Sequence, residues 1–211
     1  MTKMEVVLLA YTQVNPDLFS HNSSEWVCAV AMRSCKDVLP AHKIFLTKQK
    51  QVDMIEMAKK VQHFSVLEHV SMTFSIAGVS RTLTHQLVRH RIATFSQQSQ
   101  RFVKMNEPNY VMPDFDDERK ELEFEELMDE SWALYNKFVE SGVKPEDARF
   151  VIPNACKSNI TLTMNAHSLL HFFKLRLDSH AQWEIRELAH RMYDIAKEIY
   201  PTIFNQIPEG I

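Results

Sequence analysis

The stretch VLEHVSMTFSIAGVSRTLTHQLVRHR, residues 66–91, joins a strand pattern to a helix pattern. Its first part, 66–79, is rich in β-branched and apolar residues in partial alternation, which predicts a strand. After Gly78 the spacing changes, and Leu83, Leu87 and Val88 fall on one face of a helix over 80–91. A strand that passes directly into a helix is typical of an α/β protein.

The same criteria predict the other elements of the chain. No repeat, low-complexity tract or linker interrupts them, so the sequence predicts a single α/β domain over residues 1–211. The first helix is expected to have Ser23 or Ser24 as its N-cap, and Ser141-Gly142 is expected to end the long acidic one. Strands are predicted at 3–11 and 157–164, and helices at 24–35, 48–61, 114–141, 145–150, 166–177 and 180–200.

Composition excludes several classes of protein and of site. The chain has 211 residues and only 3 glycines, too few and too far apart for a G-x-G-x-x-G fingerprint or a Walker A loop. Any bound phosphate must therefore be held by side chains. No apolar run approaches the length of a membrane-spanning helix. The unpaired cysteines Cys28, Cys35 and Cys156 match no zinc or disulfide spacing, so we expect a cytoplasmic protein that does not associate with membranes.

Charge is unevenly distributed along the chain. Ten acids and two cations between Asp114 and Glu130 give that segment −8 in a chain of net −3, so the rest carries +5. We interpret the acidic segment as the solvated face of an amphipathic helix. Residues 71–106 and 148–177 contain no acid but several cations, which indicates a localised anion site. The first stretch has four arginines and one lysine, and the guanidinium fork fits phosphate well.

Candidate groups for binding an anion are concentrated in the triplet Arg89-His90-Arg91 and in the tract 96–101. Arg89 and Arg91 are two residues apart, so they cannot share a helix face and could reach different groups of a ligand. Ser96 to Gln100 then supply neutral hydrogen-bonding groups before the next cation, Arg101. From the residues alone, a phosphate-and-ring site and a polar loop with surface arginines are both open.

The spacing Arg89-His90-Arg91, seven residues, Ser99 resembles the R-H-R-x7-S motif of the flavin-dependent thymidylate synthases. Four other blocks resemble this family in the same order. They are His63 to His69 (H-x-[ST]-x-x-E-H), Asp147 to Pro153 (A-R-x-x-L-P), Asn165 to Leu169, and Leu175 to Ile185. The match covers roughly 60–106 and 140–190.

The resemblance implies an enzyme that methylates dUMP to dTMP. Its carbon donor is methylene-tetrahydrofolate, and its hydride comes from FAD that NADPH has reduced. Arg176 matches the arginine that polarises the uracil ring and makes C5 nucleophilic. The implied FAD contacts are His63, Ser65, Glu68, Arg89, His90, Arg91, Gln97, Asn165, His167 and His171. The implied dUMP contacts are Gln86, Leu87, Val88, Arg89, Gln97, Gln98, Ser99, Gln100, Arg101, Arg149 and Arg176.

The resemblance also implies a mostly antiparallel central sheet flanked by long helices, and a homotetramer with active sites between subunits. Three features depart from the family pattern. Ser96-Gln97 replaces Asn-Glu, His171 stands where some members have asparagine, and Cys35 falls where a family serine lies near the flavin phosphate. We leave Cys35 out of the site.

Several single residues allow another interpretation. His167 and His171 have the i, i+4 spacing of a zinc pair, but no third ligand is evident, so we predict no metal. Cys156 lacks the surroundings of a nucleophile and is interpreted as structural, and Ser99 as a substrate-positioning residue. The alternative function is a non-enzymatic module that binds nucleic acid through 81–104, where phenylalanines stand among arginines. A pI near 6.4 argues against it, so no nucleic-acid partner is expected.

Overall fold

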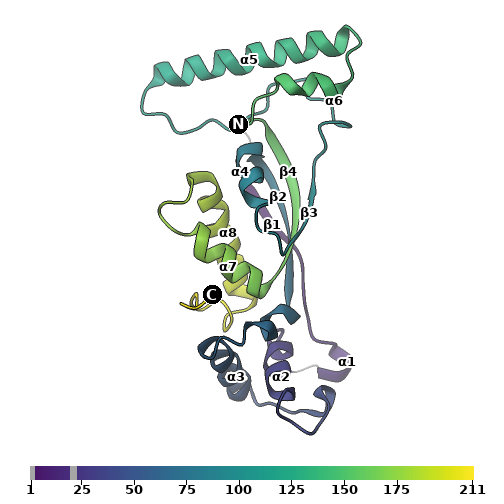
Figure 1. Cartoon of the computed structure of the whole chain (residues 1–211), viewed down its shortest axis with the longest axis vertical. Helices are drawn as coiled ribbons and strands as arrows, with labels where there is room; N and C mark the ends of the chain where they lie inside the picture. Colours follow the sequence, from purple (N-terminus) through teal and green to yellow (C-terminus); the bar gives the residue numbers. More distant parts are fainter. Residues whose placement is uncertain (1–2, 20–22) are drawn as a thin grey trace. The chain divides into compact units, whose positions relative to one another are not determined.

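The computed structural model describes residues 3–19 and 23–211. Its sheet has four antiparallel strands in the order β1-β2-β4-β3. Their bounds are Glu5–Tyr11 for β1, Ser71–Ser80 for β2, Thr94–Gln97 for β3 and Lys157–Asn165 for β4 (Figure 1). The α/β class and the antiparallel sheet are thereby confirmed.

Contacts between Cα atoms divide the chain into two compact units. Unit 1 comprises 1–5, 76–89 and 95–161, and unit 2 comprises 6–75, 90–94 and 162–211. Strands β2 and β4 each contribute residues to both units. That residues 1–211 form one domain stays a prediction.

Unit 1 contains the acidic helix. Helix α4 (Arg81–Leu87) begins at Ser80, whose side chain accepts a hydrogen bond from the Leu83 N–H as an N-cap. Helix α5 (Glu118–Glu140) is followed by Gly142, whose φ of 92° requires the left-handed conformation that glycine adopts freely. The short helix α6 (Pro145–Ala148) and the 3-10 turn η3 (Arg149–Val151) complete the unit.

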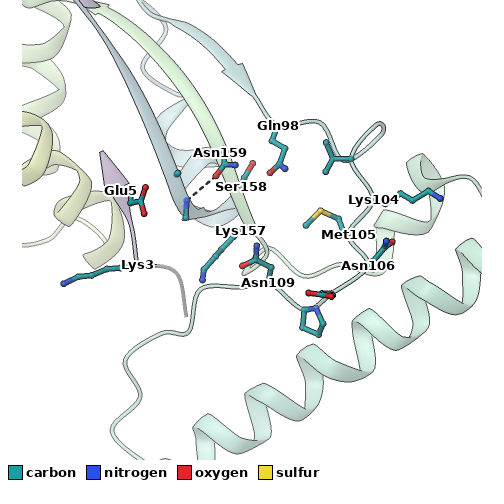
Figure 2. A pocket seen from close by; sticks show the side chains of 15 residues that line it. Lys3, Glu5, Gln98, Lys104, Met105, Asn106, Asn109, Lys157, Ser158 and Asn159 are labelled. Carbon is teal, nitrogen blue, oxygen red and sulfur yellow. Dashed lines mark hydrogen bonds between the residues drawn. The ribbon is translucent and has the colours of Figure 1, made fainter. Parts of the chain in front are cut away.

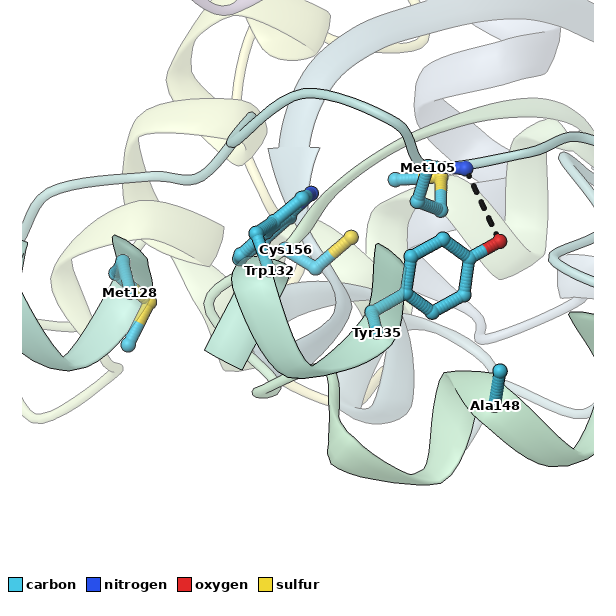
Figure 3. Packing of buried hydrophobic residues seen from close by; sticks show 6 residues of the cluster. All are labelled: Met105, Met128, Trp132, Tyr135, Ala148 and Cys156. Carbon is cyan, nitrogen blue, oxygen red and sulfur yellow. Dashed lines mark hydrogen bonds between the residues drawn. The ribbon is translucent and has the colours of Figure 1, made fainter. Parts of the chain in front are cut away.

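The core beside α5 is small and aromatic. Trp132 and Tyr135 point from α5 toward Met105 and Cys156, and the Tyr135 hydroxyl accepts a hydrogen bond of 3.3 Å from the Met105 N–H (Figure 3). Burial of the Trp132 and Tyr135 rings holds one face of α5 against this core. Most of the acidic residues of α5 are exposed, as predicted.

Unit 2 is mainly helical. It contains α1 (Pro16–Phe19), α2 (Trp26–Ser34) and α3 (Lys48–Lys60), joined by the 3-10 turn η1 (Ala41–Lys43). A second 3-10 segment, η2 (Phe64–His69), precedes β2, and helices α7 (Ala166–Arg176) and α8 (Trp183–Ile199) follow β4. Their packed interior includes Phe172, Phe173, Tyr200 and Phe204.

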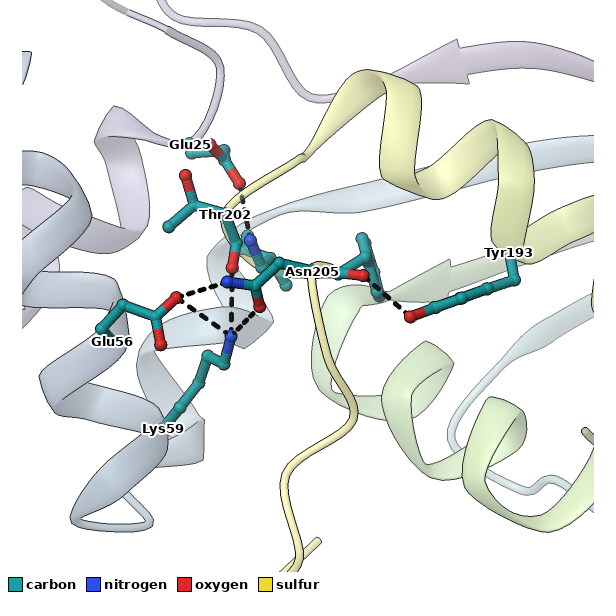
Figure 4. A network of polar contacts seen from close by, with 8 residues as sticks. Glu25, Glu56, Lys59, Tyr193, Thr202 and Asn205 are labelled. Carbon is teal, nitrogen blue, oxygen red and sulfur yellow. Dashed lines mark hydrogen bonds and ion pairs between the residues drawn. The ribbon is translucent and has the colours of Figure 1, made fainter.

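A buried polar network links α3 to the C-terminal segment within unit 2. Lys59, only 5% exposed, donates to Glu56 Oε1 at 3.3 Å, to the Thr202 carbonyl at 3.1 Å and to Asn205 Oδ1 at 2.5 Å (Figure 4). Glu25 accepts from the Ile203 N–H at 2.8 Å. These bonds hold the 202–205 turn in place, since a buried ammonium group is costly unless it is paired.

Several sequence predictions about the elements were wrong. Helix α4 ends at Leu87 and not at Arg91, and helix α5 begins at Glu118 and not at Asp114. Residues 66–69 belong to η2 and not to a strand, because a short apolar run does not by itself distinguish the two. Helix α2 begins at Trp26 with Glu25 as N-cap and no side-chain cap bond, so neither serine caps it. Helix α8 begins at Trp183, where Gln182 is the N-cap. The short strand β3 was not predicted.

Candidate functional site

Most of the predicted FAD residues belong to unit 2. They lie in or beside η2, α7 and the 90–91 segment. His167 Nδ1 donates to Glu68 Oε1 at 2.9 Å, and the His167 ring stacks on Phe64 with centroids 5.3 Å apart. The two partners of this hydrogen bond are 99 residues apart in sequence. The tertiary fold therefore brings together two of the blocks on which the resemblance depends.

Asn165 ends β4 and caps α7. Its Oδ1 accepts a hydrogen bond of 2.8 Å from the Ser168 N–H, which leaves the amide NH₂ as a donor at the start of the helix. His63 lies near α2, with Nδ1 3.2 Å from Met32 Sδ. Ser65 lies on η2.

A second group in unit 2 is built around His90. Arg176 Nε donates to His90 Nε2 at 3.1 Å, and the His90 ring contacts His171 and Phe172 edge-on, with centroids 6.3 Å and 5.0 Å away. His90 is 9% exposed. Burial, together with the charges of Arg176 and His171, lowers the pKa of His90 to about 4. At neutral pH the imidazole is therefore uncharged and serves as an acceptor for Arg176.

Arg176 is the last residue of α7, where its positive charge interacts favourably with the negative end of the helix dipole. Burial lowers the pKa of its guanidinium, which nonetheless stays charged at neutral pH. One of the five N–H groups of the guanidinium donates to His90, so the other four can donate to a ligand. Arg91 is exposed.

The predicted dUMP residues lie largely in unit 1. Gln97 donates from Nε2 to Thr84 Oγ1 at 3.0 Å and to Ser158 Oγ at 3.1 Å, so its amide joins α4, β3 and β4. Gln100 donates to Cys156 Sγ at 3.4 Å. The glutamine that departs from the family pattern therefore fits its surroundings as a hydrogen-bond donor.

Two of the predicted phosphate-binding arginines meet at one residue of α6. Arg101 Nε lies 2.8 Å from Glu146 Oε2, and Arg149 Nε donates to the Glu146 carbonyl oxygen at 3.0 Å. The Ser99 hydroxyl accepts from the Arg101 N–H at 3.2 Å. Both guanidinium groups thus come to the same place in unit 1 although 48 residues separate them in sequence.

The remaining predicted dUMP residues surround α4. Gln86 is on the helix, and Val88 and Arg89 follow it. Leu87 is fully buried, so only its main chain could touch a ligand. Gln98 lines a cavity in unit 1 that the sequence did not reveal.

The structure also bears on the cysteines and on metals. Cys156 is fully buried, and burial raises the pKa of its thiol, which disfavours the nucleophilic thiolate. Within 3–19 and 23–211 no three His, Cys, Asp or Glu residues are arranged to hold a metal ion. No helix in the described part of the chain is long and apolar enough to cross a bilayer.

Comparison with known proteins identifies the family of the chain. The family profile described as "Thymidylate synthase complementing protein" matches residues 17–202. The chain is 40% identical to the flavin-dependent thymidylate synthase of Clostridium tetani over 95% of its own length and 85% of that protein. It is 40% identical to the flavin-dependent thymidylate synthase of Geobacter sulfurreducens, over 98% of its own length and 88% of that protein. It is 49% identical to the flavin-dependent thymidylate synthase of Pyrococcus abyssi, over 67% of its own length and 62% of that protein. The chain therefore belongs to the flavin-dependent thymidylate synthase family.

Proposed function

We propose that this protein catalyses the reductive methylation of dUMP to dTMP, with methylene-tetrahydrofolate as carbon donor and NADPH as the source of reducing equivalents through FAD. The observation that carries the proposal is the bond from Arg176 to His90. It joins the arginine expected to polarise uracil to the centre of the R-H-R motif at 3.1 Å.

Arg176 is the catalytic residue in this proposal. A guanidinium beside the uracil ring favours the enolate-like form of the pyrimidine and so makes C5 more nucleophilic. At 4 Å and an effective dielectric constant of 20, such a contact is worth about 4 kcal/mol. Because His90 fixes Nε, the plane of the guanidinium is set before substrate arrives, and less reorganisation is needed in the reaction.

The residues of unit 2 fit FAD by the chemistry of their donor groups. His63, Ser65, Arg91 and the Asn165 amide supply donors, and the hydrogen bond of Glu68 with His167 orients an imidazole beside the Phe64 ring. These groups suit a diphosphate and a polar ring edge, and none requires a glycine loop. When bound, FAD supplies the hydride that reduces the transferred methylene group to methyl. Arg89, His90, Gln97, His167 and His171 are proposed as further contacts of the cofactor.

Apart from Arg176, the proposed dUMP contacts lie in unit 1. Arg101 and Arg149 face the phosphate, and their bonds to Glu146 order both side chains. Ser99 and Gln100 hold the nucleotide together with Gln86, Gln98 and the segment 87–89. Ser99 acts by hydrogen bonding, as a positioning residue.

No cysteine acts as a covalent nucleophile in this proposal. Cys156 is fully buried, and its sulfur accepts a hydrogen bond from Gln100. Burial raises the pKa of its thiol. A thiol in such surroundings is a poor nucleophile. Activation of uracil is therefore assigned to the positive charge of Arg176 and not to covalent addition of a cysteine to the ring.

The proposal includes a cytoplasmic homotetramer with active sites between subunits. Leu122, Leu127 and Leu134 on α5 are 56%, 53% and 39% exposed, which supports burial of this helix against another copy. Light scattering of the purified protein tests the assembly, and a monomer at micromolar concentration would contradict it. The free thiols of Cys28, Cys35 and Cys156 support a reducing compartment.

The alternative function, a non-enzymatic module that binds nucleic acid through 81–104, finds less support. Membership of an enzyme family and the pairing of Arg101 with Glu146 both favour a small-molecule site. Titration of the purified protein with FAD separates the two functions. The enzyme turns yellow and retains the flavin through gel filtration, whereas a protein that stays colourless contradicts the proposed function.

A further inference from the structure

A cavity of about 640 Å³ lies in unit 1, on the side of β4 that carries Lys157 and Asn159. Its wall comes from the start of the described chain, from β2, from the 103–109 loop and from β4 (Figure 2). The volume lies within the range of small-molecule sites, roughly 300–1,000 Å³. Of the residues assigned above to dUMP or FAD, Gln98 lines it and the others do not.

Strand β4 borders both this cavity and the Gln97 hydrogen bonds. Successive side chains of a strand point to opposite faces. The Ser158 hydroxyl accepts from Gln97 on one face, and Lys157 and Asn159 project from the other, although Ser158 also borders the cavity. Most of the wall is therefore distinct from the proposed dUMP and FAD contacts.

Lys157 is the unusual residue of the wall. It is 8% exposed, and among the described residues it forms no ion pair and its ammonium group makes no hydrogen bond. Burial lowers the pKa of the Lys157 ammonium group. A buried cation without a partner is costly, and an anion in the cavity would offset that cost.

The other lining residues narrow the class of anion. Lys3 and Lys104 add positive charge at the exposed rim, whereas Glu5 and Glu107 oppose it. Two carboxylates in the wall disfavour a polyanion such as a nucleic acid. The amides favour a polar ligand, because Asn159 Oδ1 accepts from the Gly78 N–H at 3.4 Å and its NH₂ remains a donor, while Asn109 lies beside Lys157 (Figure 2).

We propose that this cavity binds a small organic oxyanion, whose carboxylate or phosphate group pairs with Lys157 and whose polar body is hydrogen-bonded by Asn109 and Asn159. Apart from Gln98, which is also a proposed dUMP contact, the lining residues have no part in the proposed catalytic function. Its ligand is small enough for 640 Å³ and carries one or two negative charges.

The test observes Lys157 directly in the full-length protein. Lysine amines are reductively ¹³C-dimethylated and followed by NMR, and Lys157→Met identifies the Lys157 signal by its loss. Inorganic phosphate and succinate are the probes, titrated at constant ionic strength with sodium chloride. Lys43, exposed and in unit 2, is the internal control, and Lys43→Met assigns its signal.

The expected result is a saturable shift of the Lys157 signal with phosphate, succinate or both, half-complete at about 1–10 mM, as one partly buried charge pair predicts. Its titration midpoint should rise when the probe binds, and the Lys43 signal should move no more than with chloride. Response to one probe alone identifies the preferred oxyanion. A Lys157 signal that follows Lys43 with both probes, or that titrates normally without them, overturns the proposal.

Discussion

Arg176 Nε and His90 Nε2 lie 3.1 Å apart although 86 residues separate them in sequence. Burial keeps the imidazole neutral, with a pKa of about 4, so it accepts a hydrogen bond from the guanidinium instead of repelling its charge. The end of α7 is thereby joined to the R-H-R motif. The arrangement predicts that the two residues act together.

Replacing Arg176 with alanine should abolish methyl transfer and leave FAD bound. The variant loses the charge that stabilises the enolate-like pyrimidine, and we expect turnover to fall by about 10³ or more, to a level at which product is not detected. Flavin absorbance after gel filtration reports cofactor retention, and single-turnover kinetics report the chemical step. Wild-type turnover in this variant would refute the assigned role of Arg176.

His90 should make stability depend on pH between its ordinary pKa of 6.5 and its folded value of about 4. Above pH 6.5 the imidazole is neutral in both states. As the pH falls through this window the unfolded chain takes up a proton and the folded chain does not, so the free energy of unfolding falls. From pH 7 to pH 5 the loss due to His90 should be about 2 kcal/mol.

The matched variant is His90→Gln, whose amide oxygen accepts from Arg176 but does not titrate in this range. Urea unfolding at pH 7 and pH 5 measures both proteins. The wild type should lose about 2 kcal/mol more than the variant. Equal losses would contradict a neutral, buried His90.

Arg149→Lys should weaken dUMP binding about tenfold or more and change FAD binding little. Lysine keeps the charge but lacks the planar fork that binds phosphate through two hydrogen bonds. Calorimetric titration with each ligand measures the split. An equal loss for both ligands would argue against placing Arg149 at the dUMP phosphate.

Lys59→Met should lower the free energy of unfolding by about 3 kcal/mol, because it leaves the Thr202 carbonyl and the Asn205 amide oxygen without their donor. Lys60→Met is the control, since the neighbouring side chain is exposed and should change stability by less than about 0.5 kcal/mol. Chemical denaturation compares the two variants. Similar stabilities would mean that the network around Lys59 does not hold the C-terminal segment.

The elements with strong local signals could be predicted from the sequence. Helix α5 follows from its acidic first turns and from Gly142, and β4 follows from its alternation. Residues 66–69 could not be assigned in this way, because Val66 and Leu67 are buried in η2 as they would be in a strand. Strand β3 has four polar and apolar residues that acquire their conformation only beside β4.

The site was predictable as a set of residues but not as a set of contacts. Motif spacing identified Arg89 to Arg91 and Ser99, yet the bonds of Arg176 to His90 and of Glu68 to His167 depend on tertiary packing. Glu146 was not expected at all. Its position one turn before Arg149 on α6 was a usable signal, because an acid there can order a neighbouring arginine.

Tritium release from [5-³H]dUMP is the most direct test of the central claim. The purified protein is incubated with FAD, NADPH and methylene-tetrahydrofolate, and Arg176→Ala serves as the control. We predict that the wild type releases tritium and forms dTMP only when all three are present, and that the variant binds FAD but does neither. An FAD-loaded wild-type protein that releases no tritium and forms no dTMP under these conditions would contradict the account.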